Sequence, residues 1–363
     1  MSDKNPLQKI HDAGQAIWLD SIKRSYLGEG AYLDRLISAG EIHGLTSNPA
    51  IFAKAVAEDD TYDAQVDPMV EQGADAREIL WAVMKDDIVA ACDQFAAVYE
   101  SSDGADGYVS IEVDPAHAFD TERTVSEALS LWQEIDRPNL MVKVPGTEPG
   151  LAAITRLIGE GLNVNVTLLF SVDRHRAVMD AYMAGLERRR DAGGKLDHIA
   201  SVASFFVSRV DAKVDGLLPE GHDLRGKVAI ANARAAYGAF LEVTASDRWQ
   251  SLAADGAKPQ RPLWASTSTK DPSLPDTLYV DELVGPQTVN TVPEPTMDAT
   301  RDHGAEPTDN LNGRVDEALA LLARLPELGV DLGQVTKELE TEGVEKFVDS
   351  FEEAVATVAG AAD

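Results

Sequence analysis

The stretch NLMVKVP, residues 139–145, decides the fold. It reads as a short buried strand. Side chains alternate along a strand, so Val142 and Val144 point to one face while Lys143 points to the other. Charged residues are almost never fully buried unless they are paired or have a function. Lys143 therefore predicts that the second face of this strand carries functional groups.

Seven further short runs have the same β-rich character, and stretches with helical periodicity separate them. These runs are AIWLD (16–20), IHGLTSN (42–48), GYVSIEVD (107–114), LNVNVTLLF (162–170), HIASVASFF (198–206), PLWAST (262–267) and QTVNTVP (287–293). Alternating strands and helices predict a parallel sheet, and eight such units predict a (β/α)₈ barrel, the α/β fold also called a TIM barrel.

A doubly wound open sheet is the alternative α/β architecture. It would be favoured by a glycine-rich phosphate loop near the first strand. GEGAYL (28–33) lacks the third glycine of the dinucleotide-binding pattern, and AGGKLD (192–197) lacks the earlier glycine of a phosphate loop. The barrel is therefore the better prediction.

The C-terminal part of the chain changes in character after Pro295. TMDATRDHGAEPTDNLNG (296–313) is rich in turn formers and charge, and two amphipathic stretches, 314–325 and 331–358, follow it. We expect one domain over residues 1–363, in which roughly 296–363 form helices that pack on the barrel.

Composition narrows the class of protein. The chain has 62 acidic and 32 basic residues, a net charge of −30, which argues against nucleic acid or an anionic membrane as a partner. Any anionic substrate needs a local basic pocket. The N-terminal stretch lacks the pattern of a secretory signal, so we expect a cytoplasmic protein, and Cys92 is expected to be a packed core thiol. The oligomeric state stays open between monomer and homodimer.

Polar residues occur in phase on neighbouring strands. Glu112, Lys143, Asn165 and Thr167 all fall on the face opposite the apolar side chains of their strands. Parallel strands are normally apolar on both faces, so this pattern favours an active site at the carboxyl ends of the barrel strands. Other polar residues at the ends of strands join the same set: Asp20, Thr46, Asn48, Ser204, Arg209, Ser266 and Lys270.

Each of these residues also has a structural interpretation. Asp20 is a possible helix N-cap, Asn48 a turn residue before a proline, and Arg209 and Lys270 solvated surface charges. Lys143 and Glu112 are the exceptions. Their structural interpretation would be a buried ion pair, and such a pair contributes little net stability, so a function is the better interpretation of these two residues.

A lysine among apolar walls loses the solvation that favours its charged form, so a neutral amine becomes available. Such an amine attacks carbonyl carbons, and the resulting iminium lets a neighbouring carbon–carbon bond break or form. Glu112 and Asp20 are candidates for the proton transfers that this chemistry requires. The scattered histidines form no metal-binding pattern, so we expect no metal and no cofactor.

Five motifs, in order along most of the chain, resemble the transaldolase family. They are GLTSNPAIF (44–52), SIEVDP (110–115), MVKVPGTEPG (141–150), LNVNVTLLFS (162–171) and VASFFVSRVD (202–211), and EGVEKFV (342–348) resembles the family's terminal helix. The resemblance implies a (β/α)₈ barrel whose Schiff-base lysine lies on the fourth strand. It also implies transfer of a dihydroxyacetone unit from sedoheptulose 7-phosphate to glyceraldehyde 3-phosphate, which gives erythrose 4-phosphate and fructose 6-phosphate in the non-oxidative pentose phosphate pathway.

The resemblance also implies roles for single residues. Lys143 would attack the donor ketone, Glu112 would act through a water in forming and hydrolysing the imine, and Asp20 would take the proton of the C4 hydroxyl. The remaining residues would hold the substrate's hydroxyls, the catalytic water and the phosphate: Asn48, Asn165, Thr167, Ser204, Arg209 and Ser266.

One departure concerns the phosphate site. Many family members have an arginine two residues after the serine of the seventh strand, where this chain has Ser268, and we expect Lys270 to compensate. Two rival functions remain open. A fructose 6-phosphate aldolase would release free dihydroxyacetone, although those relatives lack a glutamate at position 112, and a catalytically silent barrel would only bind.

Overall fold

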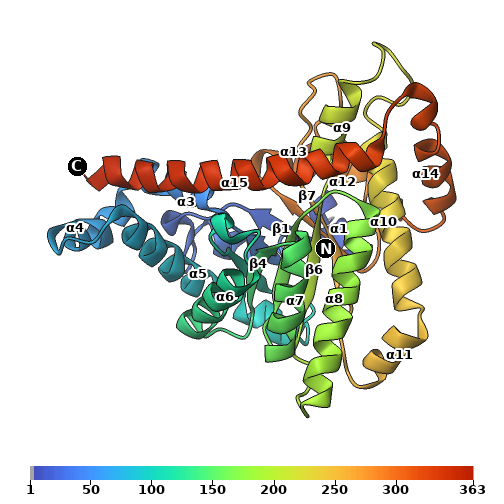
Figure 1. The fold of residues 1–363 in the computed structure, drawn as a ribbon. Helices are drawn as coiled ribbons and strands as arrows, with labels where there is room; N and C mark the ends of the chain where they lie inside the picture. Colours follow the sequence, from blue (N-terminus) through green and yellow to red (C-terminus); the bar gives the residue numbers. More distant parts are fainter. Residues whose placement is uncertain (1–3, 363) are drawn as a thin grey trace.

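The computed structural model describes residues 4–362, and it contains a closed barrel of eight parallel strands in chain order (Figure 1). The strands are β1 (Gln15–Asp20), β2 (Gly44–Thr46), β3 (Tyr108–Glu112), β4 (Leu140–Pro145), β5 (Val164–Leu169), β6 (Ser201–Phe206), β7 (Arg261–Ala265) and β8 (Thr288–Val292). Strand β8 pairs with β1 and closes the barrel. The predicted (β/α)₈ barrel is confirmed.

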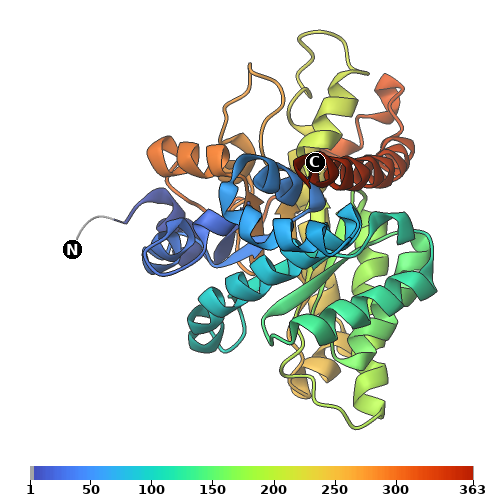
Figure 2. The same ribbon diagram turned by 90° about the vertical axis from the view of Figure 1, so that its left-hand side faces the viewer.

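Helices surround the barrel on its outside (Figures 1 and 2). They are α1 (Pro6–Asp12), α2 (Tyr32–Ser38), α3 (Pro49–Glu58), α4 (Asp63–Glu71), α5 (Ala76–Ser101), α6 (Thr121–Ile135), α7 (Glu148–Glu160), α8 (Val172–Asp191), α9 (Ser208–Asp215), α10 (Val228–Thr244), α11 (Asp247–Ala254), α12 (Leu278–Glu282), α13 (Glu294–His303), α14 (Val315–Leu322) and α15 (Leu332–Ala362). Four short 3₁₀ turns are η1 (Arg24–Tyr26), η2 (Asp60–Tyr62), η3 (Pro115–His117) and η4 (Pro326–Leu328). Residues 1–3 and 363, which belong to the single domain expected from the sequence, lie outside the described residues.

Three of the helices that follow strands begin at side-chain caps. Asn48, Thr147 and Ser171 each accept a hydrogen bond from the backbone N–H three residues later, at the start of α3, α7 and α8 respectively. Such caps satisfy backbone donors that a helix leaves without partners in its first turn. The caps therefore fix where the chain turns from strand to helix at the carboxyl end of the barrel.

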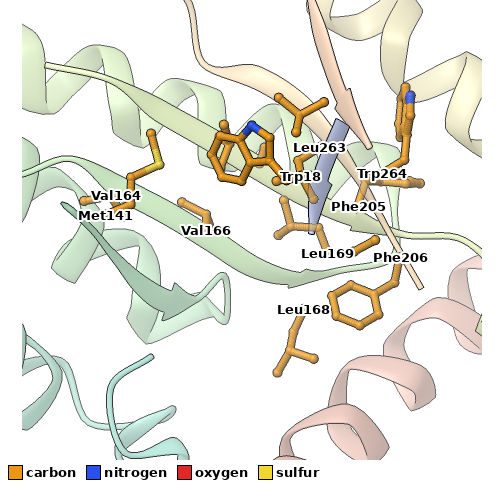
Figure 3. Packing of buried hydrophobic residues seen from close by; sticks show 14 of the residues in the cluster. Trp18, Met141, Val164, Val166, Leu168, Leu169, Phe205, Phe206, Leu263 and Trp264 are labelled. Atoms are coloured by element: carbon orange, nitrogen blue, oxygen red, sulfur yellow. The ribbon is translucent and has the colours of Figure 1, made fainter. Parts of the chain in front are cut away.

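The lower part of the barrel interior is filled by large apolar side chains. Trp18 is fully buried and belongs to the same cluster as Met141 and Leu263 (Figure 3). A Cβ atom at Gly44 would lie 2.6 Å from the Trp18 indole, so the neighbouring strand must have a glycine at this point. The tryptophan therefore fills space that a side chain on β2 would otherwise occupy.

The C-terminal helix α15 is long and runs across the barrel at the side where the strands end (Figure 1). Ion pairs hold it to three other helices. Lys213 of α9 contacts Glu342 at 2.5 Å, Arg174 of α8 contacts Glu340 at 3.2 Å, and Arg77 of α5 contacts Glu352 at 2.5 Å. Thus α15 bridges elements that are far apart in the sequence.

The turn-rich stretch that begins at residue 296 starts inside a helix, α13, because Pro295 lies in the first turn, where a missing N–H costs nothing. Among the described residues, no helix has the length and apolar character needed to cross a bilayer.

Candidate active site

A cavity of about 190 Å³ opens at the carboxyl ends of the barrel strands. Its walls come from every strand except β3, from the segments after β2, β6, β7 and β8, and from α15. Nine of the polar residues predicted from the sequence line it: Asp20, Thr46, Asn48, Lys143, Thr167, Ser204, Arg209, Ser266 and Lys270. This is the face at which barrel enzymes place their catalytic groups.

Lys143 and Glu112 form a buried pair beside this cavity. They stand opposite each other on β4 and β3, and Nζ of Lys143 lies 3.1 Å from Oε2 of Glu112. The Glu112 side chain is 0% exposed and that of Lys143 is 8% exposed. Burial raises the pKa of Glu112, and the charge of Lys143 opposes this shift. Oε1 of Glu112 has no hydrogen-bond partner among the described residues, so this oxygen remains available to a water or a reacting group.

Asp20 faces the same cavity from β1. Burial raises the pKa of Asp20, while the charge of Lys143 and a hydrogen bond from Thr46 lower it. Oγ1 of Thr46 donates to Oδ1 of Asp20 at 2.7 Å and lies 2.6 Å from Oγ1 of Thr291. Within residues 4–362, Asp20 caps no helix. The N-cap interpretation of this residue is therefore wrong.

Asn165 lies one layer beneath the cavity. Its side chain is fully buried, donates to Oγ of Ser110 at 3.0 Å and accepts from Oγ of Ser204 at 2.7 Å. Asn165 is also the register partner of Lys143 on the adjacent strand. Thr167 does line the cavity, and its hydroxyl has no partner among the described residues. Asn165 thus holds neighbouring side chains in place, whereas Thr167 presents a hydroxyl without a protein partner at the cavity wall.

Asn48 combines two tasks. Its Oδ1 accepts the backbone N–H of Ile51 at 3.1 Å and so caps α3, as the turn interpretation implied. It nevertheless lines the cavity. The cap orients the amide, which leaves two N–H donors for a ligand.

The outer end of the cavity carries positive charge. Arg209 lies over the Phe206 ring, with 5.3 Å between the guanidinium carbon and the ring centroid, and burial lowers the pKa of Arg209. Within the described part of the chain, Arg209 has no acidic partner, and Lys270 has none either. In a protein of net charge −30, two cations without carboxylate partners on one cavity indicate an anion site.

Ser266 and Ser268 follow β7 at this end. Ser266 has a left-handed backbone with φ 56° and its hydroxyl lies 2.9 Å from that of Ser208. Ser268 also lines the cavity and contacts the hydroxyl of Thr296 at 2.9 Å. The serine at position 268 is therefore tied to α13, and Lys270 supplies the cation on this loop.

The model of the transaldolase/fructose-6-phosphate aldolase family matches residues 17–358. The chain belongs to this family. A protein named transaldolase from Thermobifida fusca is 54% identical over 360 residues, which cover 98% of this chain and 98% of that protein. Proteins of the same name from Parafrankia sp. and Saccharopolyspora erythraea are 51% and 53% identical and match 97% and 99% of this chain, and 97% and 98% of their own lengths.

Five cavity residues were not among the predicted site residues of this family member: Phe206, Ala265, Thr291, Pro293 and Phe347. Thr291 comes from β8, Phe206 from the end of β6, and Phe347 from α15. Thr291 lies near the end of the eighth predicted strand, and this position is the signal that could have found it, because alternation alone groups it with Val289. An apolar side chain carries no polar signal, so the two phenylalanines could be assigned to the site only from the structure.

Proposed function

We propose that this protein is a transaldolase that transfers a dihydroxyacetone unit from sedoheptulose 7-phosphate to glyceraldehyde 3-phosphate through a Schiff base on Lys143. The products are erythrose 4-phosphate and fructose 6-phosphate. The observation that carries the proposal is the buried Lys143–Glu112 pair, 3.1 Å apart, at the inner end of a cavity in a chain of this family.

The first step joins the amine to the donor. Burial disfavours charge on Glu112, whose Oε2 lies 3.1 Å from Nζ of Lys143, so this carboxylate is placed to take the proton that the amine must lose before it attacks. The amine nitrogen attacks the ketone carbon, and the carbonyl oxygen takes protons and leaves as water. Glu112 supplies and recovers these protons, directly or through a water held at its Oε1 atom.

Cleavage of the C3–C4 bond requires a base for the C4 hydroxyl. Asp20 lines the cavity, and the burial that raises its pKa makes its carboxylate a stronger base. When Asp20 takes the hydroxyl proton, the bonding electrons move into the iminium and form an enamine, and the aldehyde product departs. Addition of the acceptor aldehyde reverses these steps.

Recognition of the sugar phosphate uses the other cavity residues. Asn48, Thr167 and Ser204 present donors and acceptors to the hydroxyls of the three-carbon unit, and Asn165 orients Ser204 from below. Arg209 and Lys270, with Ser266, bind the phosphate at the outer end.

Reduction with sodium borohydride tests the proposal. With fructose 6-phosphate present, intact mass and peptide mapping should find a reduced dihydroxyacetone adduct on Lys143. Lys143→Met should abolish the adduct, and Lys195→Met, at an exposed lysine, should leave it intact. Absence of the adduct in folded wild-type protein would overturn the covalent mechanism.

An assay without an acceptor aldehyde distinguishes a transaldolase from a fructose 6-phosphate aldolase. A transaldolase should consume fructose 6-phosphate at full rate only when an acceptor aldehyde is present. Cleavage at the full rate without an acceptor, with equimolar free dihydroxyacetone, would instead identify an aldolase.

A further inference from the structure

Phe347 reaches the reactive lysine from the far end of the chain. It lies on α15, yet its ring centroid is 5.4 Å from Nζ of Lys143, and its side chain lines the cavity. The ring of Phe206 lines the same cavity and packs edge-on against Phe347, with 6.4 Å between the two ring centroids. The lysine nitrogen therefore has an apolar cover on the side of α15.

Local backbone features bring α15 close to the site. Leu168 has φ 63° inside β5, at a register shift between Val166 and Leu169, which departs from regular strand geometry next to Thr167. A Cβ atom at Gly343 would lie 3.0 Å from Leu168. The small residue on the helix and the irregular residue on the strand thus let α15 approach, one turn before Phe347.

The ion pairs of α15 hold this arrangement in place. They lie on both sides of Phe347, at Glu340 and Glu342 before it and at Glu352 after it. Phe351, one turn further on, is fully buried and packs against Trp81 and the Arg77 guanidinium. The ring of Phe347 is thereby anchored from both ends of its helix segment.

We propose that Phe347 covers the Schiff-base nitrogen and the enamine carbon, and so sets the ratio of group transfer to hydrolysis. The inference rests on the proposed function, which places the enamine on Lys143. A proton from water on the enamine carbon would give an iminium, and addition of water would release dihydroxyacetone and the free amine. A phenyl ring occupies the space of that water, and its face favours the cationic iminium at this distance.

The experiment measures two rates for the same enzyme preparation. One is release of free dihydroxyacetone from fructose 6-phosphate without acceptor, and the other is transfer with acceptor. In Phe347→Ala the ratio of release to transfer should rise about tenfold, which corresponds to about 1.4 kcal/mol between the two barriers. In Phe347→Leu, which keeps an apolar side chain, the rise should be smaller, and Lys346→Ala, at an exposed neighbour, should leave the ratio unchanged.

Two results would decide against the inference. If both rates of Phe347→Ala fall in parallel and the ratio is unchanged, the residue only packs the helix. If that variant does not fold, an unchanged ratio in Phe347→Leu has the same meaning. Failure of the proposed function is a separate outcome, because wild-type protein would then give no borohydride adduct with fructose 6-phosphate.

Discussion

Glu112→Gln is the most direct test of the proton transfers at Lys143. A glutamine keeps the shape of the side chain, and its amide oxygen can still accept from Nζ at the wild-type distance of 3.1 Å. It cannot take up or deliver a proton. The substitution therefore removes the acid–base function while the local packing and one hydrogen bond remain.

The expected effects of Glu112→Gln on kcat and on stability follow from two magnitudes. General acid–base catalysis contributes about 10²- to 10⁴-fold to a rate, so kcat should fall by this factor. The ion pair itself is worth about 5 kcal/mol by Coulomb's law at 3.1 Å and an effective dielectric of 20, but desolvation of both charges offsets most of it. The variant should stay folded, because glutamine keeps the shape of the side chain and its amide oxygen can still accept from Nζ of Lys143.

The assay combines borohydride trapping at a series of reaction times with steady-state kinetics. Trapping should show the adduct on Lys143 forming more slowly in Glu112→Gln than in wild type, and Glu100→Gln, at an exposed position, should match wild type in both measurements. A folded Glu112→Gln variant that keeps kcat within about threefold of wild type would refute the proton-transfer role, because acid–base catalysis contributes at least about a hundredfold.

Three further predictions concern single contacts. Thr46→Val removes a hydrogen-bond donor that lowers the pKa of Asp20, so this pKa should rise. Because Asp20 must be ionised to act as a base, the acid limb of the pH profile of kcat/KM should move to higher pH. An acid limb at the wild-type pH would contradict this prediction. Arg209→Ala should raise KM for fructose 6-phosphate about ten- to hundredfold and leave unphosphorylated fructose unaffected, as donor-specific kinetics would show. Gly44→Ala should lower the free energy of unfolding by about 1–3 kcal/mol, because its Cβ would lie 2.6 Å from Trp18; an unchanged denaturant midpoint would be evidence against this packing.

The sequence was sufficient for the barrel because each strand is short, apolar and separated from the next by a helix. The phase of each strand was equally readable where polar and apolar residues alternate, as at Glu112 and Lys143. Register across strands was not readable. The pairing of Lys143 with Asn165, and the position of Asn165 below the cavity, depend on hydrogen bonding between strands that no local pattern specifies.

Contacts from distant segments were also beyond the sequence. Thr46, Thr291 and Asp20 form one hydrogen-bonded chain, although they come from the second, eighth and first strands. Phe347 belongs to a helix whose amphipathic pattern predicts only that it packs on something. Its position over Lys143 depends on ion pairs and on the irregular backbone at Leu168, and neither has a signal in a single sequence.

Inside this barrel, apolar packing residues and functional residues are separated by only two positions along a strand. On β1 the inward position changes from Trp18 to Asp20, and on β4 it changes from Met141 to Lys143. Two residues raise the chain by about 6.5 Å, enough to pass from a filled interior to the cavity. The apolar layer lies below Lys143, and the ring of Phe347 lies 5.4 Å from its Nζ on the side of α15. Lys143 thus lies between an apolar layer and an aromatic ring, with Glu112 at 3.1 Å as its hydrogen-bond partner, and the proposed enamine would form where these groups limit the access of water.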